Sequence, residues 1–455
     1  MINKLVVEFE YNIDNLIRSL YNEKYFFLLD SNRNNDVQSK YTYLGINPVD
    51  YLIIDDIDNI NKYETLTKLN EFYSKYRKDT IEGIDESTFN TGFLSFISYD
   101  LGLIFEDIKR KSNGEQHKLP LAFIGYYPVI IKIAEKTNGK SIITINYDDE
   151  YHKRALDLVE KIKKIQIEIS ESKDKVNIFQ LTYQEEFSDY KEKISIIKNY
   201  IYEGDIYQVN YTRQFKGYME GLNVAELYIN LRKKNPAPFA SFIHGNNWSI
   251  LSTSPERLIK NINNKLTTRP IKGTIAVADD YQQNEQNKKI LLNSIKDKSE
   301  LLMIVDLERN DLSKIAVPGS VKVEELYKLE TYETVHHLVS TISCILDKDY
   351  SPLDVIYNIF PGGSITGTPK KRAMEIIEEL EEYDRGIYTG SIGYIDHNGN
   401  FDFNIAIRTV VVEDQEVKFN VGGGITWKST AEEEFKETEV KGLGIMKGLG
   451  IEYNS

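Results

Sequence analysis

Cysteine is almost absent from this chain of 455 residues. The single one, Cys344, lies in the apolar run TISCIL. One thiol excludes both an intramolecular disulfide and a metal site built from several cysteines. Because Cys344 lacks the glycine neighbours expected of a nucleophile, we predict that it is a core residue.

Long apolar runs are missing as well. No window approaches the roughly 18 successive apolar residues that a membrane helix needs, and the opening stretch MINKLVVEFEYNIDNL lacks the basic-then-apolar order of a signal peptide. We therefore predict no membrane partner and a cytoplasmic location. The composition, 41% apolar and 28% charged, predicts a globular protein with one very large or two ordinary domains.

Positive charge is in deficit, with 56 Lys and Arg against 70 Asp and Glu and a formal net charge of -14. Binding to phosphate backbones depends on an excess of lysine and arginine, so this balance argues against a nucleic-acid partner. The charge balance does not argue against a small anionic substrate. It would have to be held by local arginine, lysine or backbone amides, or by a bound cation.

The chain divides at a charged stretch without aromatic residues, EISESKDK at residues 168–175, which we interpret as a linker. Before it, apolar runs such as YFFLLD and GFLSFISY alternate with polar turns and predict several strands with a few helices. We therefore predict an N-terminal region, residues 1–175, and a second domain, residues 182–451.

The second domain alternates between strand and helix patterns. Apolar positions spaced by three and four predict a helix that Gly204 ends, and further helices over residues 286–311, 369–383 and 431–447. Strands are predicted at WSILST, GSIGYI, FNIAIRTVVV and VKFNVGGG. Long antiparallel-type strands with helices gathered between them indicate an α+β layered protein and not a doubly wound parallel sheet.

Two of the predicted helices carry carboxylates on one face. Glu434, Glu437 and Lys441 lie at i, i+3 and i+7 in the C-terminal helix, and Asp297 and Glu300 lie three residues apart in another. Mg²⁺ prefers a few carboxylate oxygens and keeps waters for its substrate, so a site between these helices would suit it. For each pair alone, a solvated helix face is the plainer alternative.

Two glycine-rich turns are candidate anion sites. In PGGSITGTPKKR we expect Thr368 to cap a helix that begins at Pro369, so that unpaired backbone amides face a ligand. The glycines Gly422 to Gly424 end a strand where a side chain would block the approach of a ligand carboxylate. Each turn, taken alone, is more often only a tight turn.

Three polar residues lie in apolar surroundings: Arg408 in FNIAIRTVVV, His337 in TVHHLVST and Glu256 in TSPERL. An inward-pointing guanidinium would need an anionic partner, worth about 4 kcal/mol at ~4 Å with an effective dielectric near 20, before desolvation. A substrate carboxylate would serve Arg408, and an internal Asp or Glu would serve equally well. Each of the three residues, taken alone, is more often structural.

In combination, these segments resemble the chorismate-utilising family, which includes anthranilate, aminodeoxychorismate, isochorismate and salicylate synthases. The resemblance runs from about residue 182 to residue 448, and more weakly through LLDS and GFLSFISYDLGLIFE near the N-terminus. Its segments are GDIYQVNYTR, STSPERL, RPIKGT, ELLMIVDLERND, VHHLVST, PGGSITGTPKKRAMEIIEELE, YTGSIGYI, FNIAIRT, VGGGI and EFKETEVK. It implies the family's α+β fold, a large layered β-sandwich with helices outside and between the sheets.

Two positions indicate the branch of the family. Members that add water to the ring have a lysine base where this chain has Gln208, and a neutral amide cannot deprotonate water, so the resemblance implies ammonia as nucleophile. Anthranilate synthases read Pro-Ile-Ala-Gly-Thr where this chain reads RPIKGT, with Lys272. This is similar to aminodeoxychorismate synthases, which exchange the ring hydroxyl of chorismate for an amino group on the route to 4-aminobenzoate and folate.

The resemblance also implies roles for single residues. Lys272 attacks ring carbon 2 while the hydroxyl at carbon 4 leaves, Glu256 protonates that hydroxyl, and His337 orients the substrate. The implied ligands of a Mg²⁺ cofactor are Glu300, Glu437, Asp297 and Glu434. The implied substrate-binding residues are Arg408, Lys441, Gly424, Gly390, Thr274 and Gln208.

A partner is implied as well, because in this family ammonia comes from a glutamine amidotransferase with its own catalytic Cys and His. With Cys344 as the only thiol, we expect a separate amidotransferase subunit. Two alternatives stay open: anthranilate synthase component I, and a non-catalytic regulator that binds chorismate or tryptophan. Lys272 argues against the first, and the retention of Lys272, Glu256 and both carboxylate helices argues against the second.

Overall fold

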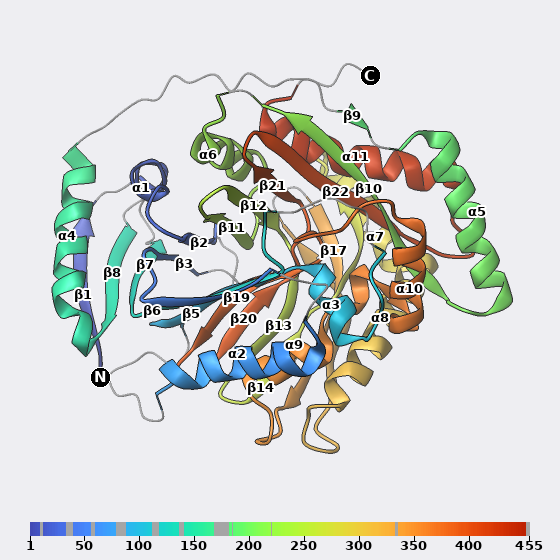
Figure 1. Ribbon diagram of the computed structural model, residues 1–455. Helices are drawn as coiled ribbons and strands as arrows, with labels where there is room; N and C mark the ends of the chain where they lie inside the picture. The colour runs from blue at the N-terminus through green and yellow to red at the C-terminus, as the bar shows by residue number, and fades with distance from the viewer. Residues whose placement is uncertain are drawn as a thin grey trace.

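The computed structural model describes residues 1–9, 12–32, 40–55, 60–78, 88–111, 118–135, 141–167, 182–183, 185–219, 221–332 and 335–451. Within these ranges the chain forms two large antiparallel β-sheets with helices packed on them (Figure 1). The predicted linker, residues 168–175, lies outside the described residues. None of the described helices is both long enough and apolar enough to cross a membrane.

The first sheet, called sheet A here, has 12 strands. From one edge to the other its strands are β1 (Ile2–Phe9), β8 (Ser141–Asp148), β7 (Val129–Glu135), β3 (Tyr41–Gly45), β2 (Phe26–Asp30), β11 (Phe239–His244), β12 (Trp248–Ser254), β21 (Thr409–Glu413), β22 (Glu416–Ile425), β10 (Gln208–Tyr218) and β18 (Gly367–Thr368), and β9 (Thr182–Tyr183) also pairs with β10.

The second sheet, sheet B, has 10 strands. Its order is β15 (Ile271–Ala276), β17 (Val335–Ile345), β14 (Lys265–Thr268), β13 (Arg257–Ile262), β20 (Phe401–Asn404), β19 (Ser391–Asp396), β5 (Gly92–Ile97), β6 (Ala122–Tyr127) and β4 (Asp50–Ile54), and β16 (Lys322–Thr331) pairs with β17.

The helices pack mainly on the outer faces of these sheets (Figure 1). Sheet A is covered by α1 (Ile13–Leu20), α4 (His152–Ile167), α6 (Val224–Lys234) and α11 (Ala431–Leu449). Sheet B is covered by α2 (Lys62–Tyr76), α3 (Tyr99–Phe105), α7 (Tyr281–Asn293), α8 (Ile295–Ser313) and α9 (Pro352–Ile359). At one end of the sandwich, α5 (Phe187–Glu203) and α10 (Lys370–Leu380) pack around β10. The predicted α+β layered fold is confirmed.

The interior between the two sheets is rich in aromatic side chains. Phe27 of sheet A packs on Phe123 of sheet B with ring centroids 6.4 Å apart, and Tyr43 packs on Tyr394 at 5.7 Å. Strands β5 and β6 are covered on both faces, so every residue in them is buried. This explains why GFLSFI and AFIGYY are continuous apolar runs without a polar alternation.

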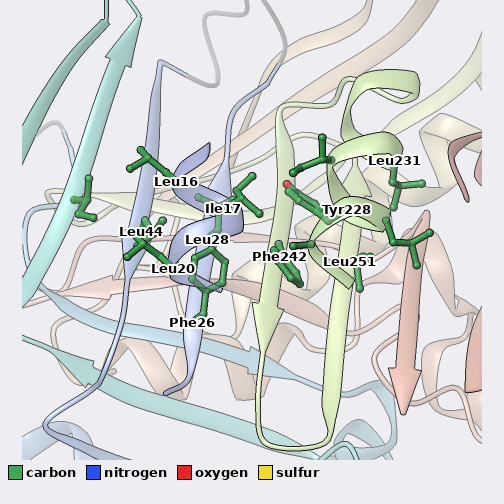
Figure 2. Packing of buried hydrophobic residues seen from close by; sticks show 14 of the residues in the cluster. Leu16, Ile17, Leu20, Phe26, Leu28, Leu44, Tyr228, Leu231, Phe242 and Leu251 are labelled. Carbon is green, nitrogen blue, oxygen red and sulfur yellow. The ribbon is translucent and has the colours of Figure 1, made fainter. Parts of the chain in front are cut away.

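The outer face of sheet A is closed by short amphipathic helices. Figure 2 shows Ile17 and Leu20 of α1 lying over Phe26 of β2, and Tyr228 of α6 beside Phe242 of β11. The last two rings are stacked with centroids 5.0 Å apart. A helix of eight residues such as α1 is marginal alone, so its apolar stripe on the sheet is what holds it.

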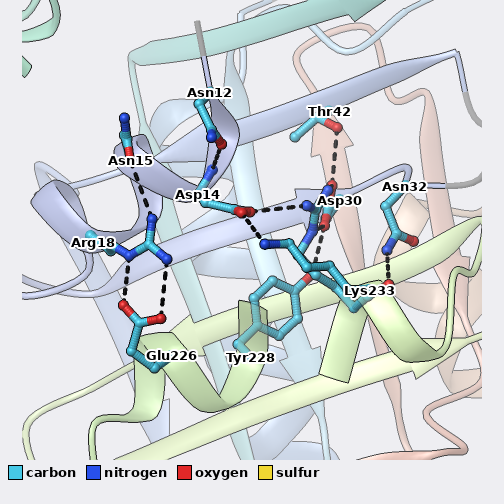
Figure 3. Close-up of polar contacts among 11 residues, drawn as sticks. Asn12, Asp14, Asn15, Arg18, Asp30, Asn32, Thr42, Glu226, Tyr228 and Lys233 are labelled. Atoms are coloured by element: carbon cyan, nitrogen blue, oxygen red, sulfur yellow. Dashed lines mark hydrogen bonds and ion pairs between the residues drawn. The ribbon is translucent and has the colours of Figure 1, made fainter. Parts of the chain in front are cut away.

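The N-terminal region and the second domain share both sheets. Strand β2 pairs with β11, and Arg18 of α1 forms an ion pair with Glu226 of α6 at 2.6 Å (Figure 3). Asp30, in the LLDS motif, is buried and accepts hydrogen bonds from the Tyr228 hydroxyl at 2.9 Å and from Arg232 Nε at 2.6 Å. The division into two domains, residues 1–175 and 182–451, stays a prediction. In the structure, strands of both parts belong to the same two sheets.

The prediction of a single helix over residues 286–311 is wrong. The chain there forms α7 and α8, because the Ser294 side chain caps α8 by accepting a hydrogen bond from the Asp297 backbone N–H at 3.2 Å.

The expected cap at Thr368 is also wrong. Thr368 belongs to β18, and Pro369 occupies the N-cap of α10 without a side-chain hydrogen bond.

The prediction of one strand through FNIAIRTVVV needs a correction too. The chain leaves sheet B after Asn404 and enters sheet A at Thr409, so the segment is two strands, β20 and β21. Arg408 lies at this crossing with φ of 51°. Its side chain therefore follows the bend between the sheets and not the alternation of a single strand.

Candidate active site

A cavity of about 560 Å³ lies among strands β15, β17 and β22 and helices α8 and α11. All but two of the predicted site residues line it. Those that do are Lys272, Glu256, His337, Arg408, Lys441, Gly424, Thr274, Glu300, Glu437, Asp297 and Glu434. Residues separated by as many as 185 positions in the chain, Glu256 and Lys441, thus meet in one place.

Lys272 reaches this cavity from a bulge in β15. The pairing of β15 with β17 shifts its register between Lys272 and Thr274, and Gly273 between them has φ of 76°, which a glycine adopts at little cost. A Cβ atom on Gly273 would lie 2.9 Å from Cγ of Asp297. Glycine in the motif RPIKGT therefore allows both the bulge and the close approach of α8.

Glu256 is the buried acid of the site, 7% exposed, and it precedes β13. Burial raises the pKa of Glu256 above its ordinary value, although a hydrogen bond from the Ser364 hydroxyl at 3.0 Å and the charge of Lys272 act in the opposite direction. A carboxyl group that keeps its proton closer to neutral pH is suited to donate it to a leaving group.

His337 lines the cavity from the neighbouring strand β17. Its Nδ1 atom is 2.8 Å from Oγ1 of Thr274, the residue directly opposite it in the register. The imidazole is 6% exposed, and its ring packs against Tyr332 with centroids 5.6 Å apart. These contacts fix the ring in one orientation at the cavity wall.

Helices α8 and α11 supply the four carboxylates of the site. Burial raises the pKa of Glu300, and the negative charges of Asp297 and Glu437 act in the same direction. Burial likewise raises the pKa of Glu434. For Glu437 burial also acts upward, but the ammonium group of Lys441 at 2.8 Å outweighs it and leaves the pKa of Glu437 below its ordinary value. The carboxylates thus form a concentrated negative wall that a cation would neutralise.

The glycines at the end of β22 form the adjoining wall. Lys441 donates a hydrogen bond to the carbonyl oxygen of Gly422 at 2.7 Å. A Cβ atom on Gly423 would lie 2.8 Å from a carboxylate oxygen of Glu434. The glycine cluster therefore lets α11 approach the strand and bring Lys441 and Glu434 to the cavity.

Gln208 and Gly390 do not line this cavity. Gln208 is buried, and a Cβ atom on Gly424 would lie 2.6 Å from its Nε2 atom, so Gly424 stands between Gln208 and the open space. At Gly390 a Cβ atom would lie 2.3 Å from the carbonyl oxygen of Ile97. Only glycine leaves room there for the neighbouring backbone, so the role of Gly390 in this structure is packing.

Arg408 lines the cavity from the crossing between the sheets. Its backbone carbonyl is held by Thr253, whose N–H donates at 3.1 Å and whose hydroxyl donates at 3.3 Å. These two bonds anchor the bend and fix the point from which the guanidinium starts. With Lys441, Arg408 offers positive charge to a ligand that carries carboxylates.

The cavity thus combines a primary amine, a buried proton donor, cationic groups and a cluster of carboxylates. This set suits a small anion that loses a leaving group. A model of chorismate binding enzymes matches residues 24–447 of the chain. The chain belongs to this family. It is an enzyme that acts on chorismate, and the cavity is the place where the family's motifs converge.

Relatives of this chorismate-binding enzyme include proteins named aminodeoxychorismate synthase and proteins named anthranilate synthase. Aminodeoxychorismate synthase component 1 of Escherichia coli is 38% identical over 365 residues, which cover 80% of this chain and 78% of that protein. Anthranilate synthase component 1 of Aquifex aeolicus is 30% identical over 471 residues, with 98% and 94% covered. The crystal structure of anthranilate synthase component I from Streptococcus pneumoniae matches with a TM-score of 0.77 at 24% identity, covering 91% of this chain and 93% of that one. This last similarity concerns the fold.

The four carboxylates meet the requirements of a metal site only in part. In the part of the chain that the structure describes, no three His, Cys, Asp or Glu residues come together as a ready-made metal cage. Their two helices nevertheless face one cavity with raised pKa values at Glu300 and Glu434. The donors present fit a hard cation that takes one or two carboxylates and completes its shell with water and substrate, as Mg²⁺ does.

Two residues of the wall were missed by sequence reasoning. Lys296 lines the cavity, and its charge favours the ionised forms of Glu300, Glu434 and Glu437. Its spacing of four from Glu300 places both on one helix face and would have been a signal. Ser364, the hydrogen-bond donor to Glu256, lies in the Gly-rich turn, where the sequence offered no sign of its partner.

Proposed function

We propose that this chorismate-binding enzyme is the chorismate-aminating subunit of aminodeoxychorismate synthase, which converts chorismate and ammonia to 4-amino-4-deoxychorismate for 4-aminobenzoate and folate synthesis. The observation that carries the proposal is that Lys272 and Glu256 line one cavity and that their charges interact. The 38% identity to a protein named aminodeoxychorismate synthase component 1 supports the same assignment.

The chemistry uses a nucleophile and an acid of this chain. The Lys272 amine, in its neutral form, forms a bond to ring carbon 2 while the C–O bond at carbon 4 breaks, and Glu256 supplies the proton that turns the departing hydroxyl into water. Ammonia then forms a bond to carbon 4 and expels Lys272 from carbon 2. His337, held by Thr274, lies on the same cavity wall and orients the ring.

Substrate carboxylates would be held by charge and by backbone. Arg408 and Lys441 line the cavity, and the Gly422–Gly424 segment lets a carboxylate come close to the main chain. We propose that Mg²⁺ is the cofactor, with Glu300 and Glu437 as main ligands and Asp297 and Glu434 beside them. When bound, it supplies positive charge that neutralises a substrate carboxylate against the acidic wall.

We also propose that ammonia comes from a separate glutamine amidotransferase subunit. An amidotransferase needs a reactive thiol, and Cys344, the only cysteine, is 1% exposed. Burial raises the pKa of the Cys344 thiol to about 12, so the thiolate nucleophile is not formed near neutral pH. The word "component" in the names of the relatives supports a two-subunit enzyme.

A second candidate function is anthranilate synthase component I, because the Aquifex aeolicus relative of that name aligns over 98% of this chain. That enzyme would place nitrogen at carbon 2 and release pyruvate. Lys272 disfavours it, because a lysine bonded to carbon 2 blocks entry of ammonia there.

The proposal is tested by the product. Purified protein is incubated with chorismate, Mg²⁺ and an ammonium salt, with and without added aminodeoxychorismate lyase, and the products are separated. Formation of 4-aminobenzoate only with the lyase supports the proposal. Fluorescent anthranilate without the lyase would instead support the second candidate, and intact chorismate would leave a non-catalytic chorismate-binding protein.

A further inference from the structure

A small second cavity of about 20 Å³ lies behind the active site, between α8, sheet B and the turn that precedes Ser364. Its walls include Glu308 and Asp311 of α8, Thr268 of β14 and the turn residues Gly362 and Gly363. A single water needs roughly 10–15 Å³ and two or more polar partners. The space and the polar groups of this cavity meet both conditions for one water molecule.

The hydrogen bonds around Glu308 are best satisfied when its carboxyl group carries a proton. Oγ1 of Thr268 is 3.0 Å from Oε2 of Glu308 and 2.8 Å from the carbonyl oxygen of Leu258. A hydroxyl has one proton, so it cannot donate to both oxygens at once. When Thr268 donates to Leu258, its oxygen can accept a hydrogen bond from Glu308, which requires a protonated carboxyl group.

The charges that face Glu308 favour the same protonated form. Burial raises the pKa of Glu308 well above its ordinary value, and the negative charges of Glu256 and Asp311 act in the same direction. Lys370 opposes them, but it forms an ion pair with Asp311 at 2.6 Å and donates to the Ile359 carbonyl at 2.8 Å. Among the described residues Glu308 forms no ion pair of its own.

The small cavity also adjoins the proton donor of the active site. Gly363 forms part of its wall, and the next residue, Ser364, donates its hydroxyl hydrogen bond to Glu256. Glu256 itself is 7% exposed and lies on the active-site side of this turn. Glu308 lies on the other side of the turn and is half-buried, so the residue is somewhat more exposed than Glu256.

We propose that Glu308 is a positioning residue that restores the proton of Glu256 between turnovers, by way of a water in the small cavity. The inference rests on the proposed function and deepens it. In each turnover the C–O bond at carbon 4 breaks with its electron pair on oxygen, and the Glu256 proton completes a water molecule. The incoming ammonia forms the C–N bond with its lone pair and keeps its three protons as the product ammonium group, while Lys272 leaves carbon 2 as the neutral amine. One proton therefore has to return to Glu256 from outside the active site.

The test compares three variants of Glu308 with a control on the same helix. In Glu308→Gln the shape is kept but no acid remains, in Glu308→Leu both hydrogen bonding and acid are lost, and in Glu308→Asp the acid is kept in a shorter side chain. Asp306→Asn removes one negative charge from the exposed face of α8 and serves as control. Chorismate consumption is followed with ammonium as nitrogen donor across pH, at a fixed concentration of free ammonia.

The proposal predicts that kcat falls in the order wild type, Asp, Gln and Leu, with a loss of roughly 10-fold or more for Gln. KM for chorismate should stay within about twofold of wild type, and the pH profile of kcat should change in Gln and not in the Asp306→Asn control. A packing role would place the isosteric Gln variant above Asp, and that order would overturn the proposal. Wild-type kcat in Glu308→Gln would overturn it as well.

A second readout needs no turnover. Infrared spectroscopy at neutral pH should show a protonated carboxyl band in the wild-type protein that is lost in Glu308→Gln, and identical spectra would contradict a protonated Glu308. The two proposals fail separately. An error in the proposed function appears in the identity of the wild-type product, whereas an error in this inference appears in the order of the variants and in the infrared band.

Discussion

Gly273 and Asp297 are so close that a Cβ atom on the glycine would lie 2.9 Å from Cγ of the aspartate. The contact joins the bulge that presents Lys272 to the helix α8 that presents the carboxylates. A change at Gly273 therefore disturbs the lysine and the acidic wall together, although the residue has no side chain of its own.

We predict that Gly273→Ala lowers both stability and activity. Alanine at φ of 76° costs about 1–2 kcal/mol in the backbone, and the clash with Asp297 adds to this cost. Gly319→Ala is the matched control, since Gly319 has φ of 79° but a Cβ atom there would meet no other atom within 4 Å. Thermal unfolding should show a loss in both variants and chorismate turnover a loss in Gly273→Ala alone. Equal activity in the two variants would contradict this interpretation of the contact.

If Lys272 acts as a covalent nucleophile, its positive charge alone cannot replace it, and two substitutions can distinguish the two properties. Lys272→Arg keeps a positive charge facing Glu256, Glu300 and Glu437 but cannot form the bond to carbon 2, whereas Lys272→Ala removes both. Both variants should lose on the order of 10³-fold or more in kcat/KM. The Arg variant should still bind chorismate in calorimetry. Near wild-type turnover in either variant would remove the covalent step.

The acidic wall predicts that Mg²⁺ stabilises the protein and that acid abolishes this effect. Bound at a hundredfold excess over Kd, the ion adds about 2.7 kcal/mol. Because the pKa values of Glu300 and Glu434 are raised, protonation competes with the metal as pH falls through those raised values, so the Tm increase should shrink in mild acid. Glu300→Gln should lose the increase, and Glu432→Gln, at an exposed position of α11, should keep it. If Mg²⁺ raised the Tm of Glu300→Gln as much as that of wild type, Glu300 would be excluded as a metal ligand.

Glu256 predicts a pH dependence of stability. Its pKa is raised above 4.5 in the folded protein, so the folded state holds the proton more tightly than the unfolded state. The stability that this proton contributes is fully present below the unfolded pKa and is lost as pH rises through the folded pKa. Glu256→Gln should therefore gain in free energy of unfolding relative to wild type as pH rises above 4.5 and through the raised pKa of Glu256, as urea titrations at several pH values would show. A parallel pair of stability curves would contradict a raised pKa.

The motifs predicted the site better than they predicted the elements that carry it. Lys272, Glu256, His337 and Arg408 were predicted as site residues from the family resemblance of their motifs, and all four line one cavity. The segments around them gave the α+β class because antiparallel strands with buried faces have distinct apolar runs. The sharing of both sheets by the two regions was not visible, since strand pairing such as that of β2 with β11 depends on distant parts of the chain.

The errors have physical causes that local periodicity does not contain. The break between α7 and α8 depends on a single cap at Ser294 inside a continuous helical pattern. The crossing at Arg408 changes sheets within a run that alternates like one strand. Glu308 escaped notice because an acid in an amphipathic helix looks like part of a solvated face, and only its contact with Thr268 distinguishes it.

The most direct test of the central claim is the position of nitrogen in the product. The protein is given chorismate, Mg²⁺ and isotopically labelled ammonium, and the product is characterised by NMR before any lyase is added. The account predicts labelled nitrogen on ring carbon 4 with the enolpyruvyl group still attached. Labelled nitrogen on carbon 2, with pyruvate released, would contradict it and would make Lys272 a bystander in this cavity.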